Sequence, residues 1–249
     1  MIIVGESKSK WIIGVIVLPI VLFVLGTLIL EDDVQQLRDR FWSRNEPFPP
    51  PLAIGDSIQF GDFEWRVLAV YDDNTVLIIT EDIISVRHYH YAWWWSLTWE
   101  DSTLREWLNN TFFRTFTHNE QQRILPRQVL NNDNIWWGTA GGNVTTDNVF
   151  LLSIEEVVRY FGDSGQLGNR SEEQYLINDN YNVVRIAVDA SGLAYWWWLR
   201  SVGDREHYAA FVDNRGILNV RGDRIYLGMP MGVRPALLIV NCLNTAQIE

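Results

Sequence analysis

Cysteine is almost missing from this 249-residue chain, and lysine is confined to its first ten residues. The single cysteine, Cys242, excludes an intrachain disulfide and a metal site built from several cysteines. After Lys8 and Lys10 every permanently charged cation is an arginine. Two interpretations remain open: a surface built for the planar, bidentate contacts of arginine, or the codon bias of the genome.

Clustered basic residues are lacking as well, and the formal net charge is -11. This balance excludes nucleic acid as a partner and argues against a polybasic patch for a membrane surface. Histidine is scarce, and the closest pair is His88-x-His90. The pair would share one face of a strand, but no third ligand accompanies it, so we expect neither a metal site nor a cofactor.

One long apolar run stands near the N-terminus, where Trp11 to Leu30 contains no charged residue. At about 1.5 Å per residue such a helix is roughly 30 Å long, which is the thickness of a bilayer core. Lysines precede the run and Glu31, Asp32 and Asp33 follow it, so residues 1–10 should be cytoplasmic and the rest extracytoplasmic. We therefore predict that residues 11–30 form a single-pass anchor in the cell membrane. The alternative is a cleaved signal peptide, although no small-x-small cleavage site is present.

A connector follows, over residues 31–54. Val34, Leu37 and Phe41 have helical spacing and predict a short juxtamembrane helix. Pro47 to Pro51 then form a stiff spacer. The remaining residues, 55–249, are long enough and aromatic enough to form one ectodomain with its own core.

The ectodomain begins with a strand-rich pattern and continues with helical periods. Strands are predicted at Ser57–Phe60, Glu64–Tyr71 and Thr75–Thr80. Helical spacing extends from residue 99 to residue 125, and capping boxes start helices at Thr117 and Ser153. Further strands are predicted at Ala194–Leu199, Tyr208–Val212, Ile217–Val220, Arg224–Leu227 and Val233–Val240, with a hairpin turn at Asp213–Gly216.

A Gly/Thr-rich loop spans residues 137–147. A phosphate-binding loop is one interpretation, but its spacing differs from GxxxxGK[ST] and it contains no lysine, so we expect a structural loop. A second aromatic cluster, Trp93 to Trp95, could be core or an exposed platform for stacking on a sugar or a protein.

The most informative pattern is Trp196-Trp197-Trp198-Leu199-Arg200-Ser201, followed after a polar stretch by Val233-Arg234-Pro235-Ala236-Leu237. A triple tryptophan exposes a large apolar area unless it is packed, so we expect a buried frame that is closed by a final core strand.

These segments resemble a known family. Together with Trp65–Leu68, Thr98–Arg105 and Phe150–Glu156, and in this order, they are similar to the bacterial domain of unknown function 6273 over roughly residues 55–240. They also resemble the ends of C-type-lectin-like domains of the formylglycine-generating-enzyme type. Some such domains are variable proteins of diversity-generating retroelements. Val202 departs from the Arg-Ser-Pro-Gly pattern that the resemblance leads us to expect.

The resemblance implies an α+β fold: a C-type-lectin-like mixed domain with short β-hairpins and two to three helices, preceded by the transmembrane helix. It also implies that the paired or tripled tryptophans and a late arginine pin the core, while the segment between them forms the ligand face. The candidate binding residues are Asp204, Arg205, Glu206, His207, Tyr208, Asp213, Asn214, Arg215, Asn219, Arg221, Asp223, Arg224 and Tyr226. They could equally be ordinary solvated hairpin residues.

Three functions are compared. The first is a membrane-anchored recognition or display module that binds a protein or glycan ligand through residues 204–226. The second is a structural or assembly subunit of a membrane or envelope complex, and an oligomer stays open. An enzyme ranks last, because one cysteine excludes formylglycine-type chemistry and no nucleophile elbow is present. Calcium-dependent sugar motifs are missing too, so we expect no calcium site.

Overall fold

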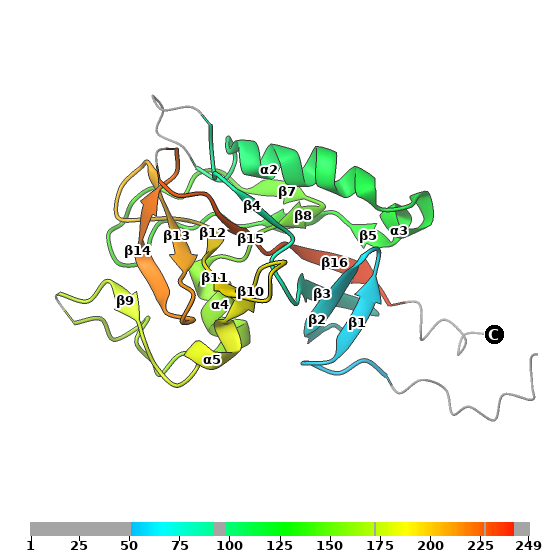
Figure 1. Cartoon of the computed structure of the whole chain (residues 1–249), viewed down its shortest axis with the longest axis horizontal. Coiled ribbons are helices and arrows are strands. Elements are labelled where there is room, and N and C mark those ends of the chain that lie inside the picture. The colour runs from blue at the N-terminus through cyan, green and yellow to red at the C-terminus, as the bar shows by residue number, and fades with distance from the viewer. Residues whose placement is uncertain (1–50, 92–97, 172, 227, 242–249) are drawn as a thin grey trace, which may run out of the picture. The chain divides into compact units, whose positions relative to one another are not determined.

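The computed structural model describes residues 51–91, 98–171, 173–226 and 228–241. The predicted cytoplasmic tail, the anchor at 11–30, most of the connector, the Trp93–Trp95 cluster and Cys242 lie outside the described residues. Within the described residues, no helix combines the length and apolar character needed to cross a bilayer. What is described is an α+β domain with many strands and few, short helices, as predicted (Figure 1).

The first of two larger sheets contains strands from the beginning and from the end of the described sequence. Its order is β1-β2-β3-β16-β5, and β8 also pairs with β16. Figure 1 shows β16, in red, between β3 and β5. Every residue of β3 is buried because this strand lies inside the sheet. The strands are β1 (Ser57–Phe60), β2 (Phe63–Val70), β3 (Thr75–Thr80), β5 (Ile124–Leu125), β8 (Val149–Phe150) and β16 (Ala236–Val240).

The second sheet carries the polar stretch that follows the triple tryptophan. Its order is β4-β15-β12-β13-β14-β9, and β12 pairs in parallel with β15. Its strands are β4 (Ser85–Arg87), β9 (Leu176–Ile177), β12 (Trp197–Val202), β13 (Tyr208–Val212), β14 (Leu218–Arg224) and β15 (Met231–Val233). Two small hairpins pair β6 (Arg127–Val129) with β7 (Thr145–Asp147) and β10 (Ala187–Val188) with β11 (Ala194–Tyr195).

The helices are more numerous than the two to three that were predicted. The described residues contain α2 (Thr103–Trp107), α3 (His118–Arg123), α4 (Ile154–Phe161) and α5 (Asn182–Arg185). A π-helical turn (Leu108–Phe112) and a 3-10 turn (Phe113–Thr115) follow α2. The prediction separated a second helix at Thr117 within residues 99–125, but it did not include the π-helical and 3-10 turns before that helix. It also overlooked α5, which is too short to show a period.

Capping determines where the helices start, as the sequence indicated. Ser102 accepts a hydrogen bond from the Arg105 N–H at 3.1 Å and starts α2. Thr117 and Ser153 form complete capping boxes at α3 and α4. Gly162, with φ of 89°, ends α4. One boundary was wrong: Ile124 and Leu125 do not continue α3 but form β5, because they pair with β16.

Two strand predictions need correction as well. The segment 233–240 is not one strand, because β15 ends at Val233 in the second sheet and β16 begins at Ala236 in the first. Arg234 and Pro235 make the crossing, and Pro235 has no N–H to donate to a ladder. The segment 224–227 is not a separate strand either, since β14 runs to Arg224 and Tyr226 follows in a turn. β1, β3 and β13 match their predicted bounds.

The core contains most of the tryptophan triplet. Trp197 and Trp198 are fully buried, and each indole N–H is satisfied by a backbone carbonyl, that of Arg185 at 3.0 Å and that of Arg87 at 2.9 Å. Trp196 is only half-buried. The expectation of a buried triplet therefore holds for two of the three rings, and the first ring is left at the surface.

Candidate functional site

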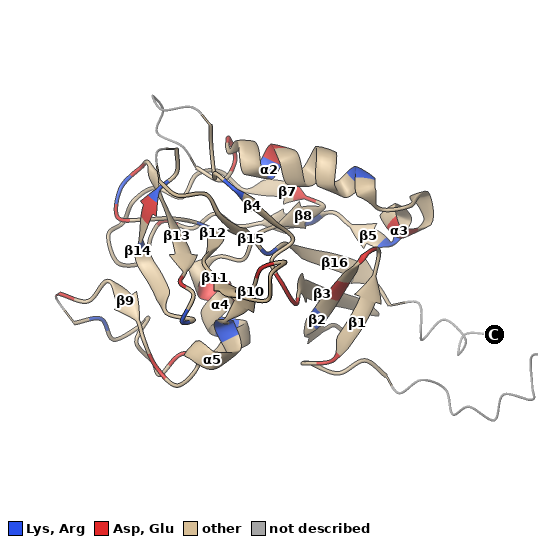
Figure 2. Ribbon diagram, viewed as in Figure 1, with Lys and Arg blue, Asp and Glu red and all other residues tan. Residues whose placement is uncertain are grey.

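All thirteen candidate residues are at least partly accessible to solvent. They occupy the β12–β13 loop, the outer positions of β13 and β14, and the turns that follow these strands. Figure 2 shows acidic and basic residues close together on this loop and on β14. The exposed members are Arg205, Glu206, Asn214, Arg215, Arg221 and Arg224. The half-buried members are Asp204, His207, Tyr208, Asp213, Asn219, Asp223 and Tyr226.

One group of candidates gathers around Asp204. Its carboxylate accepts hydrogen bonds from the Nε atoms of Arg205 at 3.0 Å and Arg221 at 3.2 Å. The Arg205 guanidinium lies 5.0 Å from the ring centroid of Tyr208, and Arg224 Nε is 3.4 Å from the Tyr208 hydroxyl. The hydrogen bond that Arg205 donates to the Asp204 carboxylate raises the pKa of Arg205. The Asp204 carboxylate pairs with Arg205 and Arg221, so opposite charges offset each other within this solvent-accessible group.

The second group is the hairpin turn that was predicted at Asp213–Gly216. Asp213 Oδ1 accepts from the backbone N–H groups of Arg215 at 2.8 Å and Ile217 at 2.9 Å. The Arg215 guanidinium folds back on the other Asp213 oxygen at 2.9 Å. Gly216 has φ of 77°, which a glycine adopts without strain. The turn is therefore fixed by its own side chains.

This turn forms one wall of a hollow of about 450 Å³ on the open face of the second sheet. Phe211 pairs with Asn219 across β13 and β14, and Asn219 pairs with Leu176 on β9. Because cross-strand partners share a face, these side chains line the same side of the sheet. The lining residues are Tyr175, Leu176, Trp196, Phe211, Asp213, Asn214, Arg215, Ile217, Asn219, Asp223 and Met231.

Five of the thirteen candidates line this hollow: Asp213, Asn214, Arg215, Asn219 and Asp223. The apolar lining was not predicted, because it comes from segments far apart in the sequence. Among the apolar lining residues, Trp196 is the one that the sequence could have indicated. It is at the edge of the tryptophan triplet, and an edge ring is the one most easily left at the surface.

In the hollow, Asn219 and Asp223 of β14 each keep one polar atom without a hydrogen-bond partner among the described residues. Asn219 Oδ1 accepts from the Gly222 N–H at 3.0 Å, which leaves its Nδ2 donor free. Asp223 Oδ1 accepts from the Arg224 N–H at 2.7 Å, which leaves its second oxygen free. Two further polar contacts lie within the lining: Asn214 Oδ1 accepts from the Trp196 indole at 3.2 Å, and Asp213 holds Arg215 at 2.9 Å.

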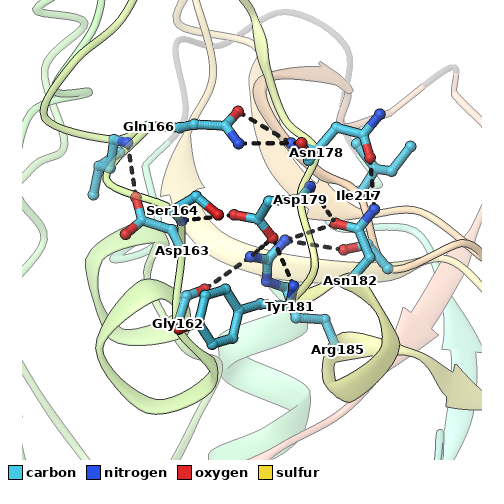
Figure 3. A network of polar contacts seen from close by, with 12 residues as sticks. Gly162, Asp163, Ser164, Gln166, Asn178, Asp179, Tyr181, Asn182, Arg185 and Ile217 are labelled. Atoms are coloured by element: carbon cyan, nitrogen blue, oxygen red, sulfur yellow. Dashed lines mark hydrogen bonds and ion pairs between the residues drawn. The ribbon is translucent and has the colours of Figure 1, made fainter.

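A buried network holds the turn from behind (Figure 3). Arg185, at the end of α5, is fully buried and pairs with Asp179 at 2.8 Å. Its guanidinium also donates to the carbonyls of Gly162 at 2.8 Å and Gly216 at 3.3 Å. Burial lowers the pKa of Arg185, and Asp179 opposes this shift. A methyl group on Gly216 would lie 1.9 Å from the Asn182 carbonyl oxygen, so the turn packs directly against α5.

The other chemical candidates have structural partners. His88 and His90 follow β4 rather than sharing a strand, and His90 Nδ1 accepts from the Thr103 N–H at 3.2 Å. Glu156 completes a capping box and pairs with Arg200. Glu100 accepts from Asn143 at 2.8 Å. In the part of the chain that the structure describes, no group of three or more His, Cys, Asp or Glu residues is arranged to hold a metal ion.

The Gly/Thr-rich loop also has structural contacts. Its Gly141 N–H donates to Asp133 Oδ1 at 3.0 Å, and a methyl group on Gly141 would lie 2.1 Å from the Asn132 carbonyl oxygen. This close approach of two backbone segments accounts for the glycine at this position.

Comparison with known proteins identifies the family. The family model described as Domain of unknown function (DUF6273) matches residues 73–241. No curated protein and no solved structure matches the chain. The matched segment covers more than half of the sequence and includes the whole hollow and all thirteen candidate residues. The chain therefore belongs to the Domain of unknown function (DUF6273) family.

Proposed function

We propose that this protein is a membrane-anchored recognition module that binds a protein or glycan ligand outside the cell through the surface of residues 204–226. One observation carries the proposal: a surface rich in Asp, Asn, Arg and Tyr surrounds a hollow on a sheet whose reverse side is packed into the core. Recognition sites combine such a rigid scaffold with accessible polar and aromatic side chains. The role is non-catalytic.

The proposed location rests on the apolar run 11–30 and its flanking charges. A labelling experiment tests it. Glu206 is exposed on the β12–β13 loop, so Glu206→Cys in a Cys242→Ser background provides a single reactive thiol. A membrane-impermeant maleimide should label this variant in intact cells. Labelling only after permeabilisation would place the domain in the cytoplasm and refute the proposal.

The recognition role is tested with the full chain in lipid nanodiscs on an array of peptides and oligosaccharides. We expect wild type to bind a subset of probes. The triple substitution Asn214→Ala, Asn219→Ala, Arg221→Ala should weaken this binding at least about tenfold, since each truncated side chain lies on the proposed surface. The matched control is Asn110→Ala on the exposed π-helical turn. No binding to any probe, or an equal effect of the control, would refute a recognition role.

We also propose that the fold is C-type-lectin-like and that the domain is related to variable proteins of diversity-generating retroelements. Support comes from Trp197 and Arg234, which pack together in the core as that resemblance implies. The test is genomic: an adjacent reverse transcriptase with a second, near-identical copy of the coding stretch for residues 204–227. A fixed neighbourhood of envelope subunits would favour the structural role instead.

One observation favours that second function, an assembly subunit. Val183 is 71% exposed, and Val184 and Ile186 next to it in the chain are also exposed. Leu193, in the turn between β10 and β11, is 67% exposed. Apolar residues that cluster on a surface typically mark a contact between proteins. If this patch joins copies of the chain, the double substitution Val183→Asp, Leu193→Asp will reduce the mass of the nanodisc-embedded protein in mass photometry. An unchanged mass would exclude this patch as the contact.

A further inference from the structure

The hollow on the second sheet has flat aromatic walls. Trp196 and Phe211 are half-buried, and Tyr175 is 43% exposed on the other side. The Trp196 ring is held in place because its indole N–H donates to Asn214 at 3.2 Å. A volume of about 450 Å³ lies within the range of sites for small ligands or for parts of larger ones. Such walls favour a ligand that presents flat C–H surfaces.

The free polar groups include both a donor and an acceptor. Asn219 offers its Nδ2 hydrogens, because its oxygen is already bonded to the Gly222 N–H. Asp223 offers a carboxylate oxygen, because its other oxygen is bonded to the Arg224 N–H. Both side chains line the same hollow and come from the same bulged strand, β14. A ligand that satisfies both must accept and donate hydrogen bonds.

An anionic ligand does not fit this arrangement. Asp223 carries a charge for which no ion-pair partner exists among the described residues. Arg215, the cation in the lining, is bound to Asp213 through two contacts of 3.1 and 2.9 Å. An anion would therefore meet the negative charge of Asp223, while Arg215 in the lining is already paired.

A cationic ligand fits only in part. An ammonium or guanidinium group would be attracted to Asp223 and to the aromatic faces. Such groups are donors without acceptor capacity, so they would leave the free N–H of Asn219 unsatisfied. A hydroxyl group, in contrast, donates to the carboxylate and accepts from the amide. Several hydroxyls on a ring with C–H faces match the walls and the polar pair together.

From these contacts we infer that the hollow binds a neutral, polyhydroxylated ring, such as a neutral sugar unit of a glycan, directly and without a metal ion. The aromatic walls stack on the ring, Asp223 accepts from a ligand hydroxyl, and Asn219 donates to one. This inference rests on the proposed recognition function and specifies the ligand class at one part of its surface.

The test uses the full chain in nanodiscs on an array of neutral, acidic and amino oligosaccharides, in buffer with EDTA and in matched buffer without it. Wild type should bind neutral spots. Asn219→Asp keeps the acceptor for Gly222 and replaces the free donor with a charged acceptor oxygen. Asp223→Asn keeps the acceptor for Arg224 and replaces the free carboxylate oxygen with an amide donor. Each should weaken binding about tenfold or more, as expected when a buried hydrogen bond to a charged group or its partner is lost.

Asp72→Asn is the matched control, because Asp72 is exposed on the turn between β2 and β3, outside the proposed surface of residues 204–226. It should bind as wild type does, and melting temperatures should show that all three variants fold. Binding restricted to acidic or amino glycans, binding that EDTA abolishes, or equal losses in all three variants would overturn the inference. Binding to peptides but to no glycan would overturn it while leaving the recognition proposal in place, and binding to no probe would refute both.

Discussion

The guanidinium of Arg234 lies over the indole of Trp197, with its central carbon 5.2 Å from the ring centroid. The ring centroid of Phe161 on α4 is 5.3 Å from the same carbon, and Arg234 Nε donates to the Thr80 carbonyl at 2.8 Å. Thr80 ends β3 in the first sheet and Trp197 begins β12 in the second. Arg234 therefore ties the sheets together where the tail crosses between them. Burial lowers its pKa to about 10.

Arg234→Ala should lower the free energy of unfolding by about 2 to 4 kcal/mol. The substitution removes the stacked plane from a fully buried site and leaves the Thr80 carbonyl without this donor. Denaturant unfolding measures the change. Arg215→Ala is the control, because Arg215 is exposed and should shift stability by only about 0.5 kcal/mol. Similar small effects of both substitutions would show that Arg234 does not join the sheets.

Gly216→Ala and Gly192→Ala separate steric packing from backbone strain. Both glycines have φ near 80°, at 77° and 78°, so each alanine incurs about 1 kcal/mol of conformational strain. Open space surrounds Gly192, whereas a methyl group on Gly216 would lie 1.9 Å from the Asn182 carbonyl oxygen. Thermal unfolding should therefore show a clearly larger loss for Gly216→Ala. Equal losses would mean that α5 does not support the wall of the hollow.

Asp179→Asn should destabilise the domain by about 3 to 5 kcal/mol, because it leaves the buried Arg185 without its countercharge. Asp204→Asn removes a carboxylate that also contacts an arginine, but Arg205 is half exposed, so the expected loss is about 0 to 1 kcal/mol. Chemical denaturation of both variants gives the comparison. A loss below about 1 kcal/mol for Asp179→Asn would contradict the role of the network in Figure 3.

His90 gives the domain a pH-dependent stability below neutrality. Burial lowers the pKa of His90 from 6.5, and the charge of Asp101 only opposes this shift. The unfolded chain therefore binds a proton at a higher pH than the folded chain, so stability falls as pH drops from about 6.5 toward the folded pKa. Protonation also removes the acceptor for the Thr103 N–H. His90→Gln should reduce this slope in melts between pH 7.5 and pH 5, and an unchanged slope would assign it to other groups.

Local features of the fold could be read from the sequence. The capping boxes at Thr117 and Ser153 and the hairpin turn at Asp213 depend on residues within a few positions of each other. The break at Arg234–Pro235 was missed because an apolar pattern shows burial but does not show that the chain leaves one sheet for another.

The hollow was predicted only in part. Residues 213–223 were identified because polar residues cluster there, but Tyr175 and Leu176 are brought in by the pairing of β9 with β14. That pairing joins residues about forty positions apart, and β9 is only two residues long, too short to leave a pattern. The sequence predicts Phe211 only as a residue of the strand 208–212, and the observed register places it beside Asn219.

Oxidative footprinting of single tryptophans, read by mass spectrometry, distinguishes a ring at a ligand site from rings in a frame. In the free protein Trp196 should be oxidised, while Trp197 and Trp198 should react only after unfolding. A neutral oligosaccharide that binds on the array should protect Trp196 and leave the other two rings unchanged. Oxidation of all three rings in the folded protein, or no protection of Trp196 by the bound oligosaccharide, would contradict a ligand hollow built on a buried tryptophan frame.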